Sequence, residues 1–375
     1  MAYLPLIKDE AIYSLMIEEQ AHAPTLVPTF LGYPVSWKPA LFFWVGTIFS
    51  ALPIPLEIAY RLPSFISGLI TVPLVYLILK RTGASQTLAF FSTFIFVISY
   101  VSTYPDSKVL IDAPAFMLIC SALYAYMRID WGRKRYFACG LLIATTFFLK
   151  FILAAIIPVL AITYLFLYEK KALMDPLLWC SFLTLPAAFM LNASLLLDAG
   201  LGGQVGLSLA SNTVSSNGFS GQIEKATAAI TTLFLGGAIW FSLSLLGFLR
   251  EWRSSLFMAF WFSLIIFPLI TASFLLWYFL PVMPAVAYFA SSLLIKWEGK
   301  ERPDRLFRII FALLAVVSII MAVILDLVYY DFYNPEREVG LMLAGKENVM
   351  VVGSYSPTLV SSKMLAEWHS LGQPL

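Results

Sequence analysis

Charged residues are scarce in this chain. Of its 375 residues, 12% are Asp, Glu, Lys or Arg, whereas a soluble domain has about 25%. Histidine and cysteine are rarer still, with two and three residues. Cys120, Cys139 and Cys180 all lie in apolar runs without a paired spacing, so we predict buried thiols that form neither disulfides nor a metal site. A zinc site built from the protein alone is therefore not expected.

Apolar residues dominate instead. The chain is 60% hydrophobic, with 31 Phe, 18 Tyr and 10 Trp, and its mean hydropathy is +0.85. The apolar runs do not alternate with polar residues, which excludes barrel strands and predicts helices that satisfy their own backbone groups in lipid. The predicted fold class is an all-α polytopic membrane protein with about ten transmembrane helices. The predicted spans lie near 61–80, 86–104, 112–128, 136–149, 151–168, 177–197, 226–249, 255–275, 278–294 and 306–328.

Basic residues fall on alternate connections between these spans. One side holds 15 of the 24 Lys and Arg residues and seven acids, and the other holds 9 basic and 15 acidic residues. The positive-inside rule makes the first side cytoplasmic. We therefore predict three parts: an external segment at 1–60 with juxtamembrane helices, a transmembrane domain at 61–328, and an extracytoplasmic segment at 329–375. Residues 105–111 and 198–225 are also predicted to lie outside the cytoplasm.

The first 60 residues are assigned to the outside with no apolar span before them. We expect one further helix upstream of residue 1; the alternative is that the following spans translocate the segment. The spacing of apolar residues in 8–20 predicts a short amphipathic helix that lies in the plane of the membrane interface. The stretch GYPVSWKPALFFW (32–44) leads into an apolar run too short to span comfortably, which predicts a second juxtamembrane helix.

Ionisable side chains gather where apolar runs begin or end on the predicted outer face. They are Asp9, Glu10, Lys38, Arg61, Asp106, Asp112 and Lys150. Ionisable groups at membrane depth are functional candidates by default. Carboxylates can remove a proton from a hydroxyl or amine, and cations can stabilise a phosphate leaving group. Lys150 also interrupts the apolar stretch 136–168, which predicts a helix break there.

Several of these charges also have a structural interpretation. Lys150 and Arg61 could be anchors that extend their ammonium or guanidinium group to the interface. Glu57 and Arg61, four residues apart, could form a helix salt bridge. Glu18 and Glu19 are predicted to lie on a solvated helix face.

The order of the motifs carries more information than any single charge. The pair Asp9-Glu10 is followed by GYPVSWKPALFFW, then by YRLPSFISGLITVPLVYLILKR, and then by DAPAFML. This order resembles the GT-C superfamily of membrane glycosyltransferases, in the branch of the protein O-mannosyltransferases and the lipid A aminoarabinose transferase. The stretch WYFLPVMPAVAY (277–288) is similar to the branch's Arg-Tyr-Leu-Leu-Pro…Pro-Ala motif.

The resemblance implies a function and a set of site residues. It implies an inverting glycosyltransferase that moves a sugar from a polyprenyl(dolichyl)-phosphate donor to a protein, lipid or glycan acceptor. The active site would face the outside of the plasma membrane. The implied catalytic carboxylates are Asp9, Glu10 and Asp112, and the implied donor-phosphate ligands are Lys38, Arg61 and Lys150. No metal ligand is assigned and no cofactor is certain, and a divalent cation is left open.

The chain departs from this branch at three places. Trp37 stands where the aminoarabinose transferase has a Glu, Trp277 replaces the usual Arg, and the segment around Lys150 lacks the usual glycine. By the resemblance, the first change would weaken any metal site there, and the second would remove a contact to the carrier phosphate.

Two other functions stay open at this point. A flippase or transporter for a polyprenol-linked sugar would favour charges near the midplane and a repeat between halves, and a structural subunit would not need Asp9, Lys38 and Asp112. Residues 198–225 are either a mobile lid or a linker. Residues 329–375 begin with the pattern of a small α/β domain and are too few to form an independent core.

Overall fold

The computed structural model describes residues 9–36, 38–202, 239–266, 276–297 and 311–325, with the single residues 309 and 327. Within these ranges the chain is mostly helical. The one sheet among them is a hairpin of β1 (Thr29–Phe30) and β2 (Tyr33–Pro34), joined through Leu31 and Gly32, which both have positive φ. The predicted segment 329–375 and most of 198–225 lie outside the described residues.

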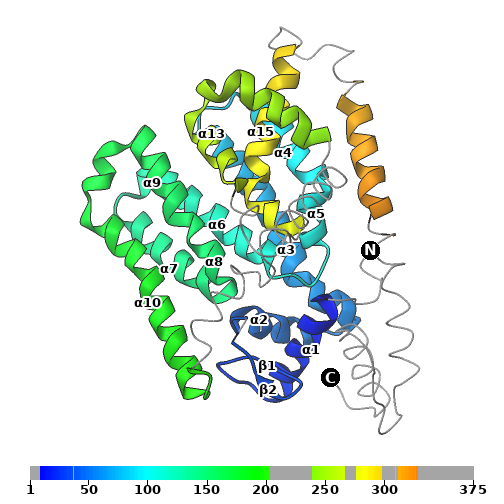
Figure 1. The fold of residues 1–375 in the computed structure, drawn as a ribbon, viewed down its shortest axis with the longest axis vertical. Coiled ribbons are helices and arrows are strands. Elements are labelled where there is room, and N and C mark those ends of the chain that lie inside the picture. The colour runs from blue at the N-terminus through cyan, green and yellow to red at the C-terminus, as the bar shows by residue number, and fades with distance from the viewer. Residues whose placement is uncertain are drawn as a thin grey trace, which may run out of the picture.

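The N-terminal elements gather at one end of the molecule. Helix α1 (Asp9–His22) matches the helix predicted at 8–20, and α2 (Leu41–Ser50) matches the second short helix. The two helices pack against each other, and with the hairpin they lie below the long helices in Figure 1. Helix α1 is covered on most sides, with nine of its 14 residues buried, so the prediction of a helix lying freely in the interface is not confirmed.

The remaining helices form the body of the protein. They are α3 (Leu56–Arg81), α4 (Gln86–Ile98), α5 (Tyr100–Asp106), α6 (Asp112–Met127), α7 (Lys134–Leu149), α8 (Phe151–Ala154), α9 (Ile156–Tyr168), α10 (Pro176–Asp198), α13 (Leu256–Ser263), α15 (Met283–Trp297) and the helix Phe311–Leu325. Short 3-10 turns lie at Ile129–Trp131 (η1), Lys170–Met174 (η2), Trp252–Ser254 (η4) and Leu276–Val282 (η5).

Four stretches of the described residues are long and apolar enough to cross a membrane. They are Leu56–Arg81, Phe151–Tyr168, Pro176–Asp198 and Tyr278–Lys296, and a fifth span results if α4 and α5, bent by 59° at their junction, are taken together. These spans identify an integral membrane protein. The predicted total of about ten is not confirmed, because several helices are shorter and the predicted spans at 226–249, 255–275 and 306–328 lie partly outside the described residues.

The predicted helix break at Lys150 is confirmed. Helix α7 ends at Leu149, Lys150 is extended with φ −153° and ψ 102°, and α8 starts at Phe151. A continuous helix would carry the ammonium group into the apolar interior, where an isolated charge is costly. The break instead brings Lys150 to a carboxylate, as described below.

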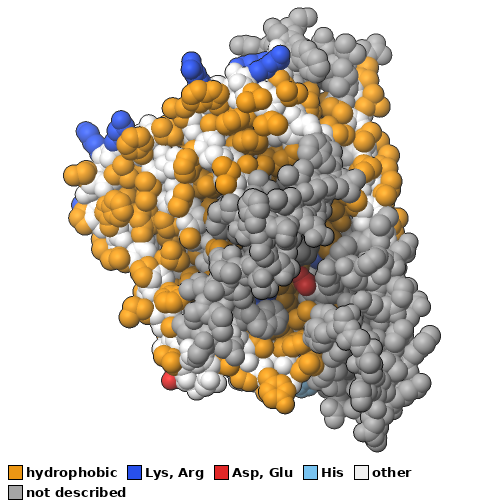
Figure 2. Space-filling view, in the orientation of Figure 1, with side chains coloured by type: hydrophobic (Ala, Val, Ile, Leu, Met, Phe, Trp, Pro, Cys, Tyr) orange, Lys and Arg blue, Asp and Glu red, His pale blue; other side chains and the backbone are white. Residues whose placement is uncertain are grey.

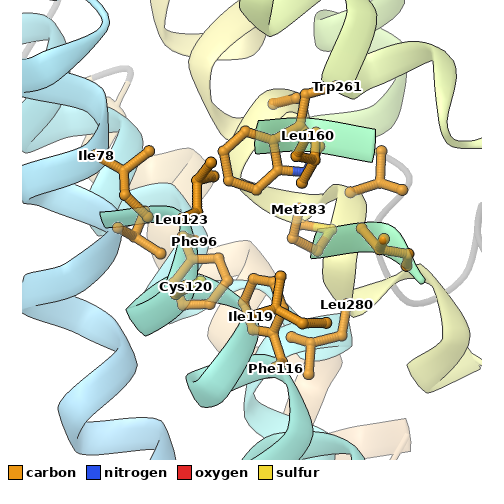
Figure 3. Packing of buried hydrophobic residues seen from close by; sticks show 14 of the residues in the cluster. Ile78, Phe96, Phe116, Ile119, Cys120, Leu123, Leu160, Trp261, Leu280 and Met283 are labelled. Atoms are coloured by element: carbon orange, nitrogen blue, oxygen red, sulfur yellow. The ribbon is translucent and has the colours of Figure 1, made fainter. Parts of the chain in front are cut away.

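Helix α6 runs through the middle of the hydrophobic core. Figure 3 shows Phe116, Ile119, Cys120 and Leu123 of this helix facing apolar residues of the surrounding helices. The surrounding residues labelled there are Ile78, Phe96, Leu160, Trp261, Leu280 and Met283. One polar group in this region is satisfied locally, because Trp261 Nε1 donates to the carbonyl of Pro281 at 2.7 Å.

Cysteine burial follows the prediction at two positions and departs from it at the third. Cys120 and Cys139 are buried free thiols, whereas Cys180 is an exposed free thiol. Cys180 lies on α10, and most of the surface of this helix is not covered by the other described elements. In a membrane protein, a residue in an apolar run can face lipid as well as the protein core, so hydropathy did not separate the two environments.

Exposed cations gather at the end of the molecule opposite the N-terminal elements. Figure 2 shows Lys and Arg side chains along the upper edge of the visible face, whereas α1, α2 and the hairpin lie at the lower end in Figure 1. At the basic end Arg135 Nη2 lies 2.7 Å from Glu169 Oε1, which joins α7 to the end of α9. Which end faces the cytoplasm stays a prediction.

Glu18 corrects a prediction. It was expected on a solvated face, but it is fully buried, and neither carboxylate oxygen has a hydrogen-bond partner among the described residues. Burial raises the pKa of Glu18 to about 7. Its neighbour Glu19 is partly exposed and accepts from the backbone N–H of Gly32 at 3.3 Å. The pattern of α1 did not reveal the difference, because a short helix covered on most sides has no clear polar face.

The buried carboxyl of Glu18 predicts a pH-dependent stability. The folded protein keeps this proton to higher pH than the unfolded chain, so stability is highest below about pH 4.5 and falls as the pH rises to about 7. We expect a loss of about 1–3 kcal/mol over that range from this group. Glu18→Gln should remove that part of the pH dependence, measured by thermal unfolding in detergent, and Glu19→Gln is the matched control. Equal pH profiles for Glu18→Gln and the parent would contradict the assignment.

Candidate functional site

The two acidic residues that open α1 have different environments. Asp9 is partly exposed, while Glu10 is buried. Carboxylates in the first turn of a helix are favoured by the positive end of its dipole. Consecutive helical residues point in different directions, so Glu10 enters the protein while Asp9 stays closer to the surface.

Glu10 holds three separate segments together. Its Oε1 accepts from Arg61 Nε of α3 at 2.8 Å and from the backbone N–H of Val109 at 3.0 Å, and its Oε2 accepts from Arg61 Nη2 at 3.1 Å. The two side chains are only 4% and 5% exposed. Ser64 Oγ, one turn further along α3, donates to the carbonyl of Leu110 at 2.8 Å. These bonds fix the turn that leads into Asp112. Arg61 therefore pairs with Glu10 and not with Glu57, the helix partner considered from the sequence.

Asp112 and Lys150 form a second ion pair between helix ends. Asp112 is the first residue of α6, and Lys150 follows the last residue of α7. Lys150 Nζ donates to Asp112 Oδ1 at 2.5 Å, with the side chains 13% and 6% exposed. The ammonium group also lies 4.2 Å from the ring centroid of Tyr278. An acid at a helix N-terminus and a cation at a C-terminus both complement the helix dipoles.

Lys38 completes a charged cluster, defined here as Asp9, Lys38, Asp112 and Lys150. Lys38 lies within electrostatic reach of the other three, and Asp9 also acts on Lys150. Burial and the neighbouring Lys150 lower the pKa of Lys38 to about 8, against the opposing effect of the two carboxylates. Four of the six residues singled out from the sequence thus lie together, and the other two, Glu10 and Arg61, are paired with each other beside them.

Two tyrosines of the site were missed by sequence reasoning. Lys38 Nζ lies 5.4 Å from the ring centroid of Tyr13, one turn after Asp9 on α1, and Lys150 lies over Tyr278. Burial, with Asp9 and Asp112 nearby, raises the pKa of Tyr13 well above its usual value, so the phenol stays neutral. The spacing of Asp9 and Tyr13 was a usable signal, whereas nothing in the sequence placed Tyr278 beside Lys150.

Asp106 occupies a separate position on the α3 side. Its carboxylate packs so closely on Gly68 that a Cβ there would lie 2.5 Å from Asp106 Cγ. Between the two acids of this connection, Lys108 is buried with its Nζ 5.7 Å from the ring centroid of Tyr104. Among the described residues, no group of three or more His, Cys, Asp or Glu side chains is arranged to hold a metal ion. Trp37 and the side chain of Trp277, where the sequence departs from the resembled motifs, lie outside the described residues.

The comparisons with known proteins agree with this architecture. Residues 37–194 match the family model of dolichyl-phosphate-mannose-protein mannosyltransferases, a range that contains Lys38, Arg61, Asp112 and Lys150 but not Asp9. No curated protein matches the chain.

Solved structures share the fold at low sequence identity. ArnT from Cupriavidus metallidurans in the apo state matches with a TM-score of 0.69 and 13% identity, over 96% of this chain and 81% of ArnT. The same protein bound to undecaprenyl phosphate matches with a TM-score of 0.63 and 13% identity, over the same shares. The oligosaccharyltransferase AglB from Archaeoglobus fulgidus, in complex with an inhibitory peptide and a dolichol-phosphate, matches with a TM-score of 0.57 and 13% identity, over 92% of this chain and 54% of AglB. Residues 37–194 are thus similar to this mannosyltransferase family, and the fold of the chain is that of ArnT and AglB.

The pair Glu10–Arg61 predicts a large stability effect. Glu10→Gln or Arg61→Ala leaves a buried charge without its partner, which typically costs about 3–5 kcal/mol. We expect either single variant to lower the unfolding temperature strongly in detergent, and the combined Glu10→Gln and Arg61→Met variant to recover part of the loss. Asp130→Asn, which removes the partner of Arg128 in an exposed ion pair, should cost less than about 1 kcal/mol. Single variants as stable as the parent would show that the pair does not hold the site together.

Proposed function

We propose that this protein transfers a sugar from a polyprenyl(dolichyl)-phosphate donor to a protein, lipid or glycan acceptor. The charged cluster is the observation that carries the proposal. It brings two carboxylates and two lysines together, three of them at or next to helix ends, in a chain whose residues 37–194 match a mannosyltransferase family model. We further propose that the enzyme acts in the plasma membrane and that the cluster faces the extracytoplasmic side, where residues 1–60 would cover the helical domain.

Lys38 and Lys150 are the proposed ligands of the donor phosphate. A phosphate leaving group gains negative charge as its bond to the sugar breaks, and cations already positioned in a site of low polarity stabilise that charge. Lys150 is held by Asp112 and Tyr278, and Lys38 lies beside the ring of Tyr13. The two ammonium groups also repel each other, and an anion bound between them would relieve this repulsion.

Asp9 is the proposed catalytic carboxylate. In an inverting transfer, the acceptor's hydroxyl or amine attacks the anomeric carbon from the face opposite the phosphate. The carbon–oxygen bond to phosphate breaks, its electron pair leaves with the polyprenyl phosphate, and the acceptor proton passes to the Asp9 carboxylate. Asp9 is partly exposed, which suits a group that must receive a proton from an incoming acceptor.

Glu10, Asp112 and Arg61 take supporting roles in this proposal. Asp112 is in contact with Lys150 and would set the position of its ammonium group. Both oxygens of Glu10 are engaged by Arg61 or Val109, which favours a positioning role for Glu10 and Arg61 over direct contact with the substrate. The resemblance implied Arg61 as a ligand of the donor phosphate. We rank it below Lys38 and Lys150 in that role.

The flippase alternative is less well supported. A transporter is expected to place its substrate site near the bilayer midplane, between repeated halves. Here the charged residues lie at the first residue of α6 and just after the last residue of α7. Helix ends are where the backbone reaches the aqueous boundary, so their position fits a site at one membrane face.

The role of Asp9 predicts a large loss of activity on removal of its charge. Asp9→Asn keeps the shape of the side chain but cannot take the acceptor proton, so transfer should fall by at least about 100-fold. The assay is transfer from radiolabelled polyprenyl-phosphate sugars to endogenous acceptors in membranes, with thermal unfolding as a check on folding. Glu19→Gln on the same helix is the control and should keep nearly full activity. Full activity in folded Asp9→Asn protein would exclude Asp9 and make Asp112 the next candidate.

The lowered pKa of Lys38 predicts pH-dependent binding of the donor carrier. The side chain is cationic below about pH 8 and neutral above it, so affinity for undecaprenyl phosphate should fall by about tenfold through this range. Lys38→Arg keeps the charge at every accessible pH and should bind with a flatter profile. Binding is measured by tryptophan fluorescence quenching between pH 6.5 and 9.5. A parent profile that matches the Lys38→Arg profile would argue against contact between Lys38 and the phosphate.

A further inference from the structure

A groove lies between α7 and α10, away from the charged cluster. Its volume is about 380 Å³, within the range of small-molecule pockets. Gly140 and Ser181 form its buried floor, while Phe137, Leu141, Leu177 and Cys180 are exposed at its rim. Gly140 allows the two helices to approach, since a Cβ there would lie 3.1 Å from Thr184 Cγ2.

The wall of the groove is apolar although it contains hydroxyl groups. Ser181 Oγ is bonded to Tyr126 and to the carbonyl of Leu178, and Thr184 Oγ1 donates to the carbonyl of Ser181. The hydroxyl of Tyr136 accepts from Arg135 at 2.9 Å. Because these groups are already satisfied within the protein, the groove is suited to a hydrocarbon chain and not to a polar ligand.

Two exposed tryptophans lie close in sequence to groove residues. Trp131 is near Arg133 and Trp179 precedes Cys180, and because exposed tryptophans are typical of the membrane interface, we infer that the groove begins at the level of lipid headgroups. From Arg133, which precedes α7, to Ala144 its wall rises by 11 residue steps, which is about 16 Å at the helical rise. Half of a hydrocarbon core is about 15 Å thick. The groove therefore has the depth of one acyl chain in one leaflet.

The mouth of the groove is cationic. Arg133 lines it with a side chain that is 74% exposed, and its Nε lies 3.2 Å from Asp175 Oδ2. The other oxygen of Asp175 already caps α10 by accepting from the N–H of Leu177 at 3.0 Å. An exposed ion pair of this kind is weak, and a guanidinium has five N–H donors, so Arg133 can also bind a phosphate. Lys134, Lys170 and Lys171 are exposed at the same end.

We propose that the α7–α10 groove binds one anionic phospholipid of the leaflet on the basic side, with an acyl chain along Gly140 and Ala144 and its phosphate at Arg133. The lipid would seal the seam between α10 and the rest of the protein. Helix α10 needs such a cover, since only 17% of its apolar window is buried by the protein. This inference does not depend on the proposed sugar transfer.

Native mass spectrometry of the purified full chain tests the proposal. The probes are phosphatidylglycerol and phosphatidylcholine with identical acyl chains. We expect one phosphatidylglycerol per protein, preferred over phosphatidylcholine. Arg133→Gln should reduce the preference by about fivefold, the effect of one cation near an anionic lipid surface. Cys180→Trp, which places an indole in the groove from its rim, should abolish the bound lipid.

Matched controls separate the groove from general lipid contact. Leu183→Trp lies on the same helix at an exposed position outside the groove and should bind lipid like the parent. Lys134→Gln removes a nearby cation that does not line the groove and should reduce the preference less than Arg133→Gln. If Cys180→Trp does not fold, Ala144→Leu narrows the groove from α7 and should lower occupancy. Unchanged occupancy in the folded groove variants, equal binding of the two lipids by the parent, or displacement of both by undecaprenyl phosphate would overturn the proposal.

Discussion

The buried pair between Glu10 and Arg61 anchors the segments that carry both carboxylates of the charged cluster. Two ions in an apolar interior are costly unless every oxygen and N–H group finds a partner, and Glu10 meets this requirement through Arg61 and the N–H of Val109. The pair therefore fixes α1 against α3 and against the turn before α6. Asp9 precedes Glu10 in the chain and Asp112 follows that turn, so both carboxylates of the charged cluster are located by this one interaction.

Three members of the charged cluster, Asp9, Asp112 and Lys150, lie at or next to helix ends, which explains how they are tolerated in so apolar a chain. Asp112 lies at the N-terminus of α6 and Lys150 at the C-terminus of α7, where the helix dipoles favour their charges. The break at Lys150 brings its ammonium group to Asp112 and Tyr278, away from lipid. The remainder of both helices is apolar and joins the core shown in Figure 3. Each of the two helices thus has a charged residue of the cluster at one end and contributes apolar residues to the core along the rest of its length.

Much of this arrangement could be predicted from the sequence, and two of the failures share one physical cause. Strong constraints gave correct predictions: an ammonium group cannot sit inside an apolar helix, so the break at Lys150 followed, and the ordered motifs indicated the similarity to membrane glycosyltransferases. Glu18 and Cys180 were assigned to the wrong environments. Hydropathy reports how apolar a residue's surroundings should be, but it does not say whether lipid, water or another helix provides them. Tyr278 was missed because its proximity to Lys150 depends on contacts between residues far apart in the chain.

In the proposed transfer, the two lysines of the cluster would change the electrostatics of the site when the donor binds. Two carboxylates and two ammonium groups give it no net formal charge, yet the charges are unevenly matched. Lys150 is bound to Asp112, whereas burial and repulsion from Lys150 lower the pKa of Lys38. A phosphate bound at both lysines would stabilise the protonated form of Lys38 and offset the repulsion between them. Departure of the polyprenyl phosphate would restore that repulsion, so the charge arrangement of the empty site would favour rebinding of the next donor.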